Sequence, residues 1–257
     1  VRAQITDETR AVIPIHFGGD VARDIFELQN LCAEKNILLF EDACHSLGAT
    51  YNNQKAGSIG DAASFSFCFN KLITTGEGGM VVTDSEKVKR RLEMLRSHGR
   101  NEDKEYVTYG YNFRLSSISA ALGVTQVKKL DYIIKKRREM ADYLNDCLKH
   151  IKYIQLPEFP EERQSVYQLY NIRFDERDIQ QALAAHLDDR GIPTRVTYDP
   201  VHLTTYYRQE WGYERGELPI TEDISKKILT LPFHMDLEES DLNRIAEGVK
   251  SFFNDDC

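Results

Sequence analysis

The sequence has no long hydrophobic run and no leader-like start. No stretch approaches the ~18 consecutive apolar residues that a membrane-spanning helix needs. The first residues contain no basic segment followed by an apolar one, which is the pattern of a secretory signal. In a chain of 257 residues, these absences predict neither a membrane span nor secretion, and we expect a cytoplasmic protein.

Cysteines are few and scattered. The chain has five of them, an odd number, and no two stand in the Cys-x-x-Cys spacing of a zinc knuckle. Because small secreted domains use a dense set of paired cysteines, the sequence predicts reduced thiols without a disulfide framework or a zinc site. The five are Cys32, Cys44, Cys68, Cys147 and Cys257.

Positive charge is also in short supply. The 33 lysines and arginines are outnumbered by 41 aspartates and glutamates, which gives a net charge of −8. A nucleic-acid partner needs a dense cationic surface, so none is predicted. One basic cluster has apolar neighbours at helical spacing, which indicates the solvated face of an amphipathic helix. Its members are Lys128, Lys129, Lys135, Lys136, Arg137 and Arg138.

Proline is rare as well. Seven prolines and 29% charged residues are typical of a globular protein rather than a disordered or collagen-like one. A chain of this length buries roughly 70–75% of its unfolded surface and often forms two domains. A strand-like run follows soon after Val1, at residues 11–16, with no earlier element to pair with it. We therefore expect that an N-terminal block precedes Val1 in the natural protein.

Short apolar runs alternate with helical patterns in the first half of the chain, which is typical of a parallel sheet with helices on its faces. The predicted strands there are residues 11–15, 37–40, 62–69 and 80–83, and the predicted helices are 21–35, 86–96, 116–127 and 130–150. The second half predicts strands at 166–174 and 194–198, a helix at 177–190, and two last helices with start signals at Pro219 and Glu238.

These elements predict an α/β fold with a mostly parallel sheet flanked by helices and a smaller C-terminal α/β domain. The long helical pattern at residues 130–150 connects the two parts. We therefore predict a large domain over residues 1–130 and a small domain over residues 131–257.

A carboxylate and an imidazole stand at the predicted end of one strand. Asp42 and His45 follow the apolar run 37–40 directly, and ligands of open α/β sheets bind at the carboxyl ends of their strands. The two side chains could form an acid/base pair, a metal site or an anchor for a cofactor nitrogen. An equally simple interpretation is that Asp42 caps a helix.

A lysine stands after another strand and before a glycine-rich turn. The run 64–70 alternates apolar residues with hydroxyls and leads into Lys71, and the turn 74–79 follows. Burial and nearby positive charge lower the pKa of a lysine, as an amine nucleophile requires. The alternative is an exposed loop lysine. The glycines fit neither the dinucleotide-binding fingerprint nor the Walker A loop, which disfavours a nucleotide-binding loop.

Together these features resemble a pyridoxal 5'-phosphate (PLP) site. That cofactor needs a carboxylate to keep its ring nitrogen protonated, a lysine for its imine, and hydroxyl or backbone N–H groups for its phosphate. Asp42 precedes Lys71 by 29 residues, the order found in the aspartate-aminotransferase-like fold (fold type I of PLP-dependent transferases).

Four motifs in order narrow the resemblance to the DegT and StrS group of sugar aminotransferases, and it runs nearly from end to end. The motifs are Glu41-Asp42-Ala43-Cys44-His45-Ser46-Leu47-Gly48-Ala49, the run from Ser64-Phe65-Ser66 to Lys71, Thr75-Gly76-Glu77-Gly78-Gly79, and Gly110-Tyr111-Asn112-Phe113-Arg114. Further matches are Pro14-Ile15-His16-Phe17-Gly18-Gly19, Ser97-His98-Gly99-Arg100 and Leu229-Thr230-Leu231-Pro232-Phe233-His234.

The resemblance implies roles for five residues. Lys71 would form the imine with the cofactor and move the proton between substrate and cofactor. Asp42 would pair with the ring nitrogen, His45 would lie beside the ring, and Ser66 would bind the phosphate. Asn112 would reach the phosphate of the neighbouring subunit, which implies a homodimer with shared active sites. By itself Asn112 could equally be a turn residue after a glycine.

The resemblance also implies the reaction. It is the transfer of an amino group, expected from glutamate, to a nucleotide-linked keto sugar. Lys71 disfavours the dehydratase branch of the family, which has a histidine at that position. The alternative is a non-catalytic binding or regulatory protein that keeps the fold.

Three residues and one segment complete the prediction. His16, Tyr198 and His202 fall where the family has residues near the substrate, but such histidines are more often structural, and we assign none of the three a role. Family members carry a segment ahead of the stretch 5–9 that supplies a phosphate-binding hydroxyl and an aromatic residue on the ring. Neither can be assigned here, so we expect these 257 residues to form only part of the cofactor pocket.

Overall fold

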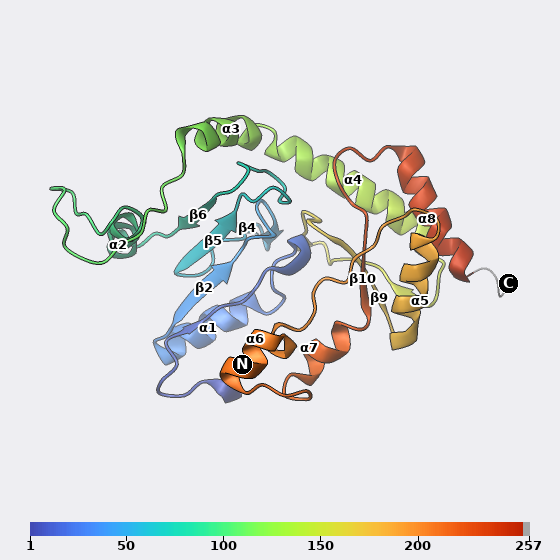
Figure 1. The fold of residues 1–257 in the computed structure, drawn as a ribbon, viewed down its shortest axis with the longest axis horizontal. Coiled ribbons are helices and arrows are strands. Elements are labelled where there is room, and N and C mark those ends of the chain that lie inside the picture. The colour runs from blue at the N-terminus through green and yellow to red at the C-terminus, as the bar shows by residue number, and fades with distance from the viewer. Residues whose placement is uncertain (254–257) are drawn as a thin grey trace. The chain divides into compact units, whose positions relative to one another are not determined.

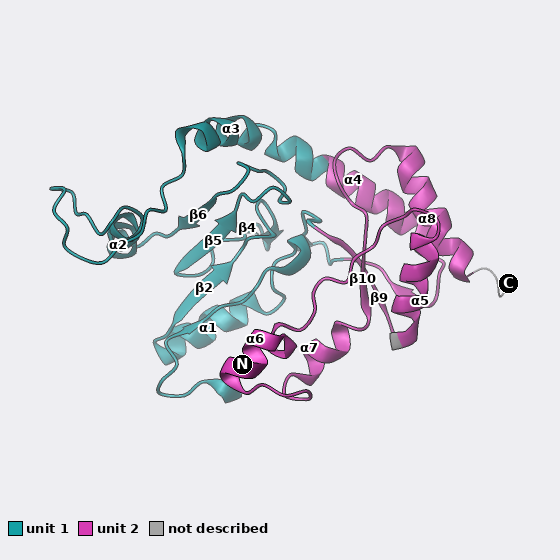
Figure 2. Ribbon diagram, viewed as in Figure 1, with its two compact units in different colours: residues 1–135, 159–168 teal, residues 136–158, 169–257 magenta. Residues whose placement is uncertain are grey.

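The computed structural model describes residues 1–253, apart from the side chain of residue 177, and the chain divides into two compact units (Figure 2). The first unit contains residues 1–135 and 159–168, and the second contains residues 136–158 and 169–257. Helix α4 (Leu130–Leu148) continues from the first unit into the second. The return of residues 159–168 to the first unit is absent from the predicted domain division, which itself stays a prediction.

The main sheet of the first unit has the strand order β1-β2-β5-β6, of which β2, β5 and β6 are labelled in Figure 1. Strands β1 (Ala11–Val12), β2 (Leu38–Asp42) and β5 (Ala62–Ser66) run parallel, and β6 (Gly79–Val82) is antiparallel to β5. This mixed, mostly parallel sheet confirms the predicted α/β class.

Helix α1 (Ile25–Lys35) packs on β1 and β2 and closes one side of the sheet. It buries Ile25, Leu31 and Cys32, which are spaced so that they share one face of a 3.6-residue helix. The helix ends at Asn36, whose φ of 52° gives a left-handed C-terminal cap.

Three further groups of elements belong to the first unit. A small sheet of order β4-β3-β8 ties the returning segment to residues near β2. Helices α2 and α3 are capped by Ser85 and Ser116, whose side chains accept from Val88 N–H and Ser119 N–H. The bounds are β3 Thr50–Tyr51, β4 Gln54–Lys55, β8 Arg163–Gln164, α2 Glu86–Arg96, α3 Ser117–Val127, and short 3-10 helices at Arg2–Gln4 and Phe17–Gly19.

The second unit is built on an antiparallel sheet of order β10-β9-β7. Helix α5 packs on β9, β10 and helix α8, and the core between them is aliphatic, with Leu183, Leu187, Ile172 and Leu229 fully buried. The bounds are β7 Ile154–Gln155, β9 Tyr170–Phe174, β10 Ile228–Leu231, α5 Arg177–Asp188, α6 Thr205–Trp211, α7 Pro219–Ile224, α8 Glu239–Phe253, and a 3-10 turn at Val201–Leu203.

Several predicted strands differ from the structure: the one at 62–69 ends at Ser66, the one at 166–174 begins at Tyr170, and two others differ more. The strand predicted at 194–198 is wrong, because that segment makes only an isolated bridge in which Arg195 N–H donates to Thr230 O (3.1 Å) and Thr230 N–H donates to Arg195 O (2.8 Å). The strand predicted at 11–15 is shortened to two residues, followed by a single bridge between Ile15 and Asp42.

The basic cluster around residue 137 was predicted to be the solvated face of a helix, but part of it is buried. Arg137 is buried, donates to Phe233 O (3.3 Å) and lies over the Phe233 ring at 4.9 Å. Lys136 donates to Met235 O. Burial lowers the pKa of Arg137 to about 10. The prediction fails here because an arginine can bury its stem and satisfy its guanidinium with backbone carbonyls and a ring.

The composition-based predictions concern membrane spans and thiols. No helix within residues 1–253 is both long enough and apolar enough to cross a membrane. Cys32, Cys44, Cys68 and Cys147 are free thiols, whereas Cys257 lies outside the described residues.

Candidate functional site

The candidate site lies at the edge where β2 and β5 end. These strands are parallel neighbours, and Asp42, the last residue of β2, pairs in register with Ser64 of β5. Lys71 follows β5 by five residues, in the turn that leads to β6. Because parallel strands present their carboxyl ends at one edge, the segments that carry Asp42 and Lys71 leave the sheet on the same side.

The backbone around Asp42 is fixed on both sides. Its N–H donates to Pro14 O (3.0 Å), its carbonyl accepts from His16 N–H (2.9 Å), and Ala43 N–H donates to Ser64 O (3.0 Å). The carboxylate oxygen Oδ1 accepts from Cys44 N–H at 3.1 Å. This bond closes a turn rather than a helix. Within residues 1–253, Oδ2 of Asp42 has no hydrogen-bond partner.

Lys71 is half-buried in a folded turn. Its N–H donates to Cys68 O at 3.1 Å, and Cys68 N–H in turn donates to Ser66 Oγ at 3.3 Å. The side-chain amine makes no hydrogen bond or ion pair with the residues that the structure describes. The backbone is therefore held while the amine stays available.

The thiol of Cys44 is influenced by both of these side chains. Its Sγ lies 3.7 Å from Ser64 Oγ. Burial raises the pKa of Cys44 and the neighbouring carboxylate of Asp42 raises it further, whereas the hydrogen bond with Ser64 and the positive charge of Lys71 lower it. The geometry agrees, since Asp42 is paired in register with Ser64 and Lys71 stands in the turn that follows the same strand. The structure thus brings Asp42 and Lys71 to one site.

The glycine-rich turn folds back on the end of β5. Phe67 O accepts from Thr75 N–H (2.9 Å) and from the Thr74 hydroxyl (3.1 Å), and Phe67 N–H donates to Gly78 O (2.8 Å). A Cβ on Gly78 would lie 2.4 Å from Thr75 Oγ1, so only glycine permits this approach. These bonds fix the loop that follows Lys71.

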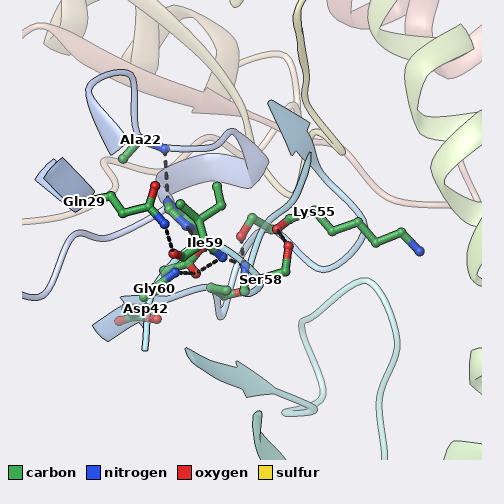
Figure 3. A network of polar contacts seen from close by, with 12 residues as sticks. Ala22, Gln29, Asp42, Lys55, Ser58, Ile59 and Gly60 are labelled. Atoms are coloured by element: carbon green, nitrogen blue, oxygen red, sulfur yellow. Dashed lines mark hydrogen bonds and ion pairs between the residues drawn. The ribbon is translucent and has the colours of Figure 1, made fainter. Parts of the chain in front are cut away.

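Behind Asp42 a buried polar network holds the end of β2 (Figure 3). Glu41 is fully buried and its carboxylate accepts four hydrogen bonds. Oε1 accepts from Ile59 N–H (2.8 Å) and Gly60 N–H (2.6 Å), while Oε2 accepts from Gly57 N–H (2.8 Å) and contacts His16 Nε2 (2.8 Å). The side chains of Glu41 and Asp42 point to opposite faces, as successive strand residues do.

The bonds of His16 define its tautomer. Nδ1 accepts from Ala22 N–H at 3.0 Å, so Nδ1 carries no proton and Nε2 carries the proton donated to Glu41. Burial raises the pKa of Glu41, but the bond from His16 and the bonds from the backbone N–H groups of residues 57, 59 and 60 outweigh it and lower the pKa overall. His16 is therefore a structural residue.

His45 and Ser66 lie on the elements next to Asp42 and Lys71. Nδ1 of His45 accepts from Gly18 N–H at 3.3 Å, and its ring lies 5.8 Å from the Phe17 ring. Ser66 and Ser64 alternate with buried or apolar positions and so share one face of β5. Both hydroxyls therefore lie on the face of Cys44.

The structure does not bring Asn112 to these residues. Asn112 is exposed in the loop between α2 and α3 (Figure 1), where it forms an antiparallel bridge with Ser97.

His202 and Tyr198, to which the sequence analysis assigned no role, belong to the second unit. His202 is buried against Glu222 (3.1 Å), which is a structural pair, and Tyr198 is exposed.

The donor set fits a cofactor better than a metal. Residues 1–253 contain no group of three or more His, Cys, Asp or Glu side chains that could hold a metal ion. Instead, one carboxylate oxygen and one amine, both without hydrogen-bond partners in the described structure, accompany two strand hydroxyls. Sequence reasoning included Cys44 in a motif but missed it as the common neighbour of Asp42 and Lys71, because its contact with Ser64 comes from the pairing of two strands.

Known proteins resemble the whole chain in sequence. GDP-perosamine synthase from Caulobacter vibrioides is 31% identical over 254 residues, which cover 97% of this chain and 67% of that protein. The chain thus spans about two thirds of the length of this relative.

Solved structures show the same fold. The chain superposes on DesV from S. venezuelae, solved in complex with a ketimine intermediate, with a TM-score of 0.91 and 32% identity, covering 98% of this chain and 67% of that one. For the putative sugar aminotransferase Spr1654 from Streptococcus pneumoniae in its PLP-form, the TM-score is 0.90 with 26% identity over 98% of this chain and 70% of that one. The family model for DegT/DnrJ/EryC1/StrS aminotransferases matches residues 1–250, and the chain belongs to this family of PLP-dependent sugar aminotransferases.

Proposed function

We propose that this chain binds pyridoxal 5'-phosphate and transfers an amino group to a nucleotide-linked keto sugar. One observation carries the proposal. Asp42 ends β2 and Lys71 follows the neighbouring parallel strand β5, so the carboxylate and the amine stand at one carboxyl edge of the sheet, where both act on the half-buried thiol of Cys44. A carboxylate and a lysine are the two side chains that this cofactor requires at its opposite reactive ends.

Asp42 is the residue for the ring nitrogen. Its Oδ1 is held by Cys44 N–H and Oδ2 has no partner within the described residues, so Oδ2 can accept a hydrogen bond from the protonated nitrogen of a heteroaromatic ring. The backbone hydrogen bonds on both sides hold the carboxylate in place. When bound, the cofactor supplies an electron sink for the carbon that carries the amino group.

Lys71 is the residue for covalent attachment and proton transfer. Its amine is tethered to a fixed turn by four flexible carbons, so it can approach a carbonyl carbon and then withdraw without movement of the backbone. As a neutral amine, Nζ would take a proton from the substrate carbon, and as the ammonium so formed it would donate that proton to the cofactor.

Ser66, His45 and Asn112 complete the proposed site. The Ser66 hydroxyl faces the same side as Cys44 and would donate to the cofactor phosphate. The His45 ring would lie beside the cofactor ring. Asn112 is exposed on a separate loop, in keeping with a role across a homodimer interface, where it would reach the phosphate of the partner's site.

The substrate class rests on relatives. One of them is named GDP-perosamine synthase, and perosamine is an amino sugar attached there to a nucleotide. We therefore propose a nucleotide-linked keto sugar as the acceptor, with glutamate as the expected amino donor.

A spectroscopic titration tests the proposal. Addition of pyridoxal phosphate to the purified protein should produce a visible imine band that borohydride bleaches. Lys71→Ala should abolish the band. Lys55→Ala, which removes an exposed lysine of β4 in the same unit, is the matched control and should leave the band intact.

The same titration distinguishes the proposed aminotransferase from the second candidate, a non-catalytic protein with the same fold. A protein that keeps the fold but shows no band, or an identical band in Lys71→Ala, would favour a non-catalytic binding or regulatory role. An intact fold in that case is checked by circular dichroism.

A further inference from the structure

A short segment from far along the sequence binds the turn that carries Lys71. Gln168 is buried and its side-chain Nε2 donates to the carbonyl of Asn70 at 2.7 Å, across 98 residues of sequence. Asn70 directly precedes Lys71. Residues 165–168, which we name the strap, therefore contact the backbone next to the candidate amine.

The strap is locked at its other side onto Gly19. Val166 N–H donates to Gly19 O (2.9 Å), and the Ser165 hydroxyl donates to the same carbonyl (3.0 Å). A Cβ on Gly19 would lie 2.5 Å from the backbone N of Gln168. Gly19 has a φ of 105°, so this contact depends on glycine both for space and for backbone conformation.

The position of Gly19 connects the strap to His45. Gly18 N–H donates to His45 Nδ1 at 3.3 Å, and Gly18 and Gly19 form one tight turn. Through backbone contacts the strap thus spans from the turn that supports His45 to the turn that bears Lys71. An ion pair between Arg163 and Asp20 (3.1 Å) anchors the residues that lead into it.

We propose that Gln168 is a positioning residue for Lys71. By donating to Asn70 O, it completes the set of backbone bonds around the turn, whose other member is the bond from Lys71 N–H to Cys68 O. With both bonds in place, the Cα of Lys71 is fixed against β5 and only the side chain moves. The contact between Gln168 and the turn is independent of the proposed function, and the proposal rests on that function only for the chemical role of the Lys71 amine.

Hydrogen exchange tests the proposal without the cofactor. Gln168→Met keeps the length of the side chain and removes the donor. Loss of one hydrogen bond of about average strength should speed amide exchange in residues 68–73 by about fivefold. Gln168→His, whose Nε2 reaches about as far from the backbone as that of glutamine, should restore protection.

Gln29→Ala is the matched control. Gln29 also donates from Nε2 to a backbone carbonyl, that of Ile59, at 2.6 Å (Figure 3). Its removal should leave exchange in residues 68–73 unchanged. A merely structural role for Gln168 predicts the same general rise in exchange for both variants, and that result would overturn the proposal, as would unchanged exchange in Gln168→Met.

A measurement on the unaltered chain covers the case in which Gln168→Met does not fold. Under native conditions with low urea, residues 68–73 and 165–168 should open in one step and show the same urea dependence of exchange. Independent opening of the two segments would overturn the proposal. Neither result depends on an imine at Lys71, so failure of the proposed function is recognised separately, by the absence of the visible band in the unaltered protein.

Discussion

Glu41 and Asp42 are adjacent residues with opposite tasks. Glu41 points inward and accepts four hydrogen bonds, three of them from the backbone N–H groups of residues 57, 59 and 60. Asp42 points to the other face and keeps one oxygen without a partner in the described structure. The buried residue fixes the strand end, and the fixed strand end aims the residue that we propose for the cofactor nitrogen.

Glu41→Gln should strongly destabilise the fold. An amide would turn its NH2 group toward N–H donors, and leaving such buried groups unsatisfied costs about 2–4 kcal/mol. Urea unfolding followed by circular dichroism measures the change. Glu34→Gln is the control, since Glu34 forms an exposed ion pair with Arg2, and its removal should change stability little.

The effect of Glu41 should also depend on pH. Its pKa is lowered in the folded state from an ordinary 4.5, so the stabilisation is complete above the ordinary pKa. It is lost as the pH falls through the folded pKa. The difference in unfolding free energy between the wild type and Glu41→Gln should therefore shrink below that range. A difference that grew in acid would contradict this account.

Asp20 should have the opposite dependence on pH. Burial raises its pKa to about 6, although Arg163 acts against the rise. Between the ordinary pKa of 3.8 and about 6, the folded state holds more protons than the unfolded state, so stability falls as the pH rises. The shift corresponds to at most about 3 kcal/mol. Unfolding of wild type and Asp20→Asn at pH 4 and pH 7 measures it, and parallel curves would contradict it.

At the scale of elements, the fold depends on close backbone approaches that only glycine permits. Gly19 supports the strap from below, with two strap N atoms within 3 Å of where a Cβ would lie. Gly76 also has a positive φ, of 80°, but nothing lies within 4 Å of its Cβ position. Comparing substitutions at Gly19 and Gly76 therefore separates the cost of a steric clash from the cost of backbone strain.

Gly19→Ala should therefore destabilise the protein more than Gly76→Ala. Both substitutions place alanine in the left-handed region, at about 1–2 kcal/mol each, and only the first forces two backbone segments apart. We expect a further loss of at least about 2 kcal/mol at Gly19. Thermal unfolding of the two variants is the measurement, and equal losses would show that the strap can move aside.

The elements also show what the sequence could predict. Helix α2 begins and ends where predicted, because Ser85 caps it and its apolar residues repeat at helical spacing. The strand at 194–198 failed because local pattern does not reveal a pairing partner, and only Arg195 finds one. Strand β10 was missed as a strand although its motif was recognised. Strand β8 was missed because its pairing depends on a return of the chain to the first unit.

For the site, motifs in the sequence predicted the residues proposed to react with the cofactor, but not the residues that fix their position. Asp42 and Lys71 stand in motifs, and the structure brings them to one edge. Gln168 has no motif, since its contact with Asn70 O is made across 98 residues. The assignments of individual roles stay predictions.

At the scale of the whole molecule, the first unit exposes many large apolar side chains. Ile118 of α3 is 86% exposed, Phe69 is 75% exposed and Phe113 is 69% exposed. Helix α3 buries none of its residues. Exposed apolar area of this extent is typical of protein interfaces, in agreement with the homodimer that we propose for this chain.

Mixing two inactive variants tests whether sites are shared between subunits. If each site combines Lys71 of one subunit with Asn112 of its partner, hybrids of Lys71→Ala and Asn112→Ala contain one intact site. Random reassociation of equal amounts makes about half of the dimers hybrid. Because each hybrid has one intact site of two, roughly a quarter of the wild-type activity should return. No gain over the separate variants would contradict a shared site.

The central claim is that Lys71, held near Asp42 at the end of a parallel sheet, is the amine that binds the cofactor. Peptide mapping by mass spectrometry after borohydride reduction of the protein with pyridoxal phosphate tests it most directly. We predict that the reduced adduct is confined to the peptide that contains Lys71. An adduct spread over exposed lysines, or absent from that peptide, would contradict the account.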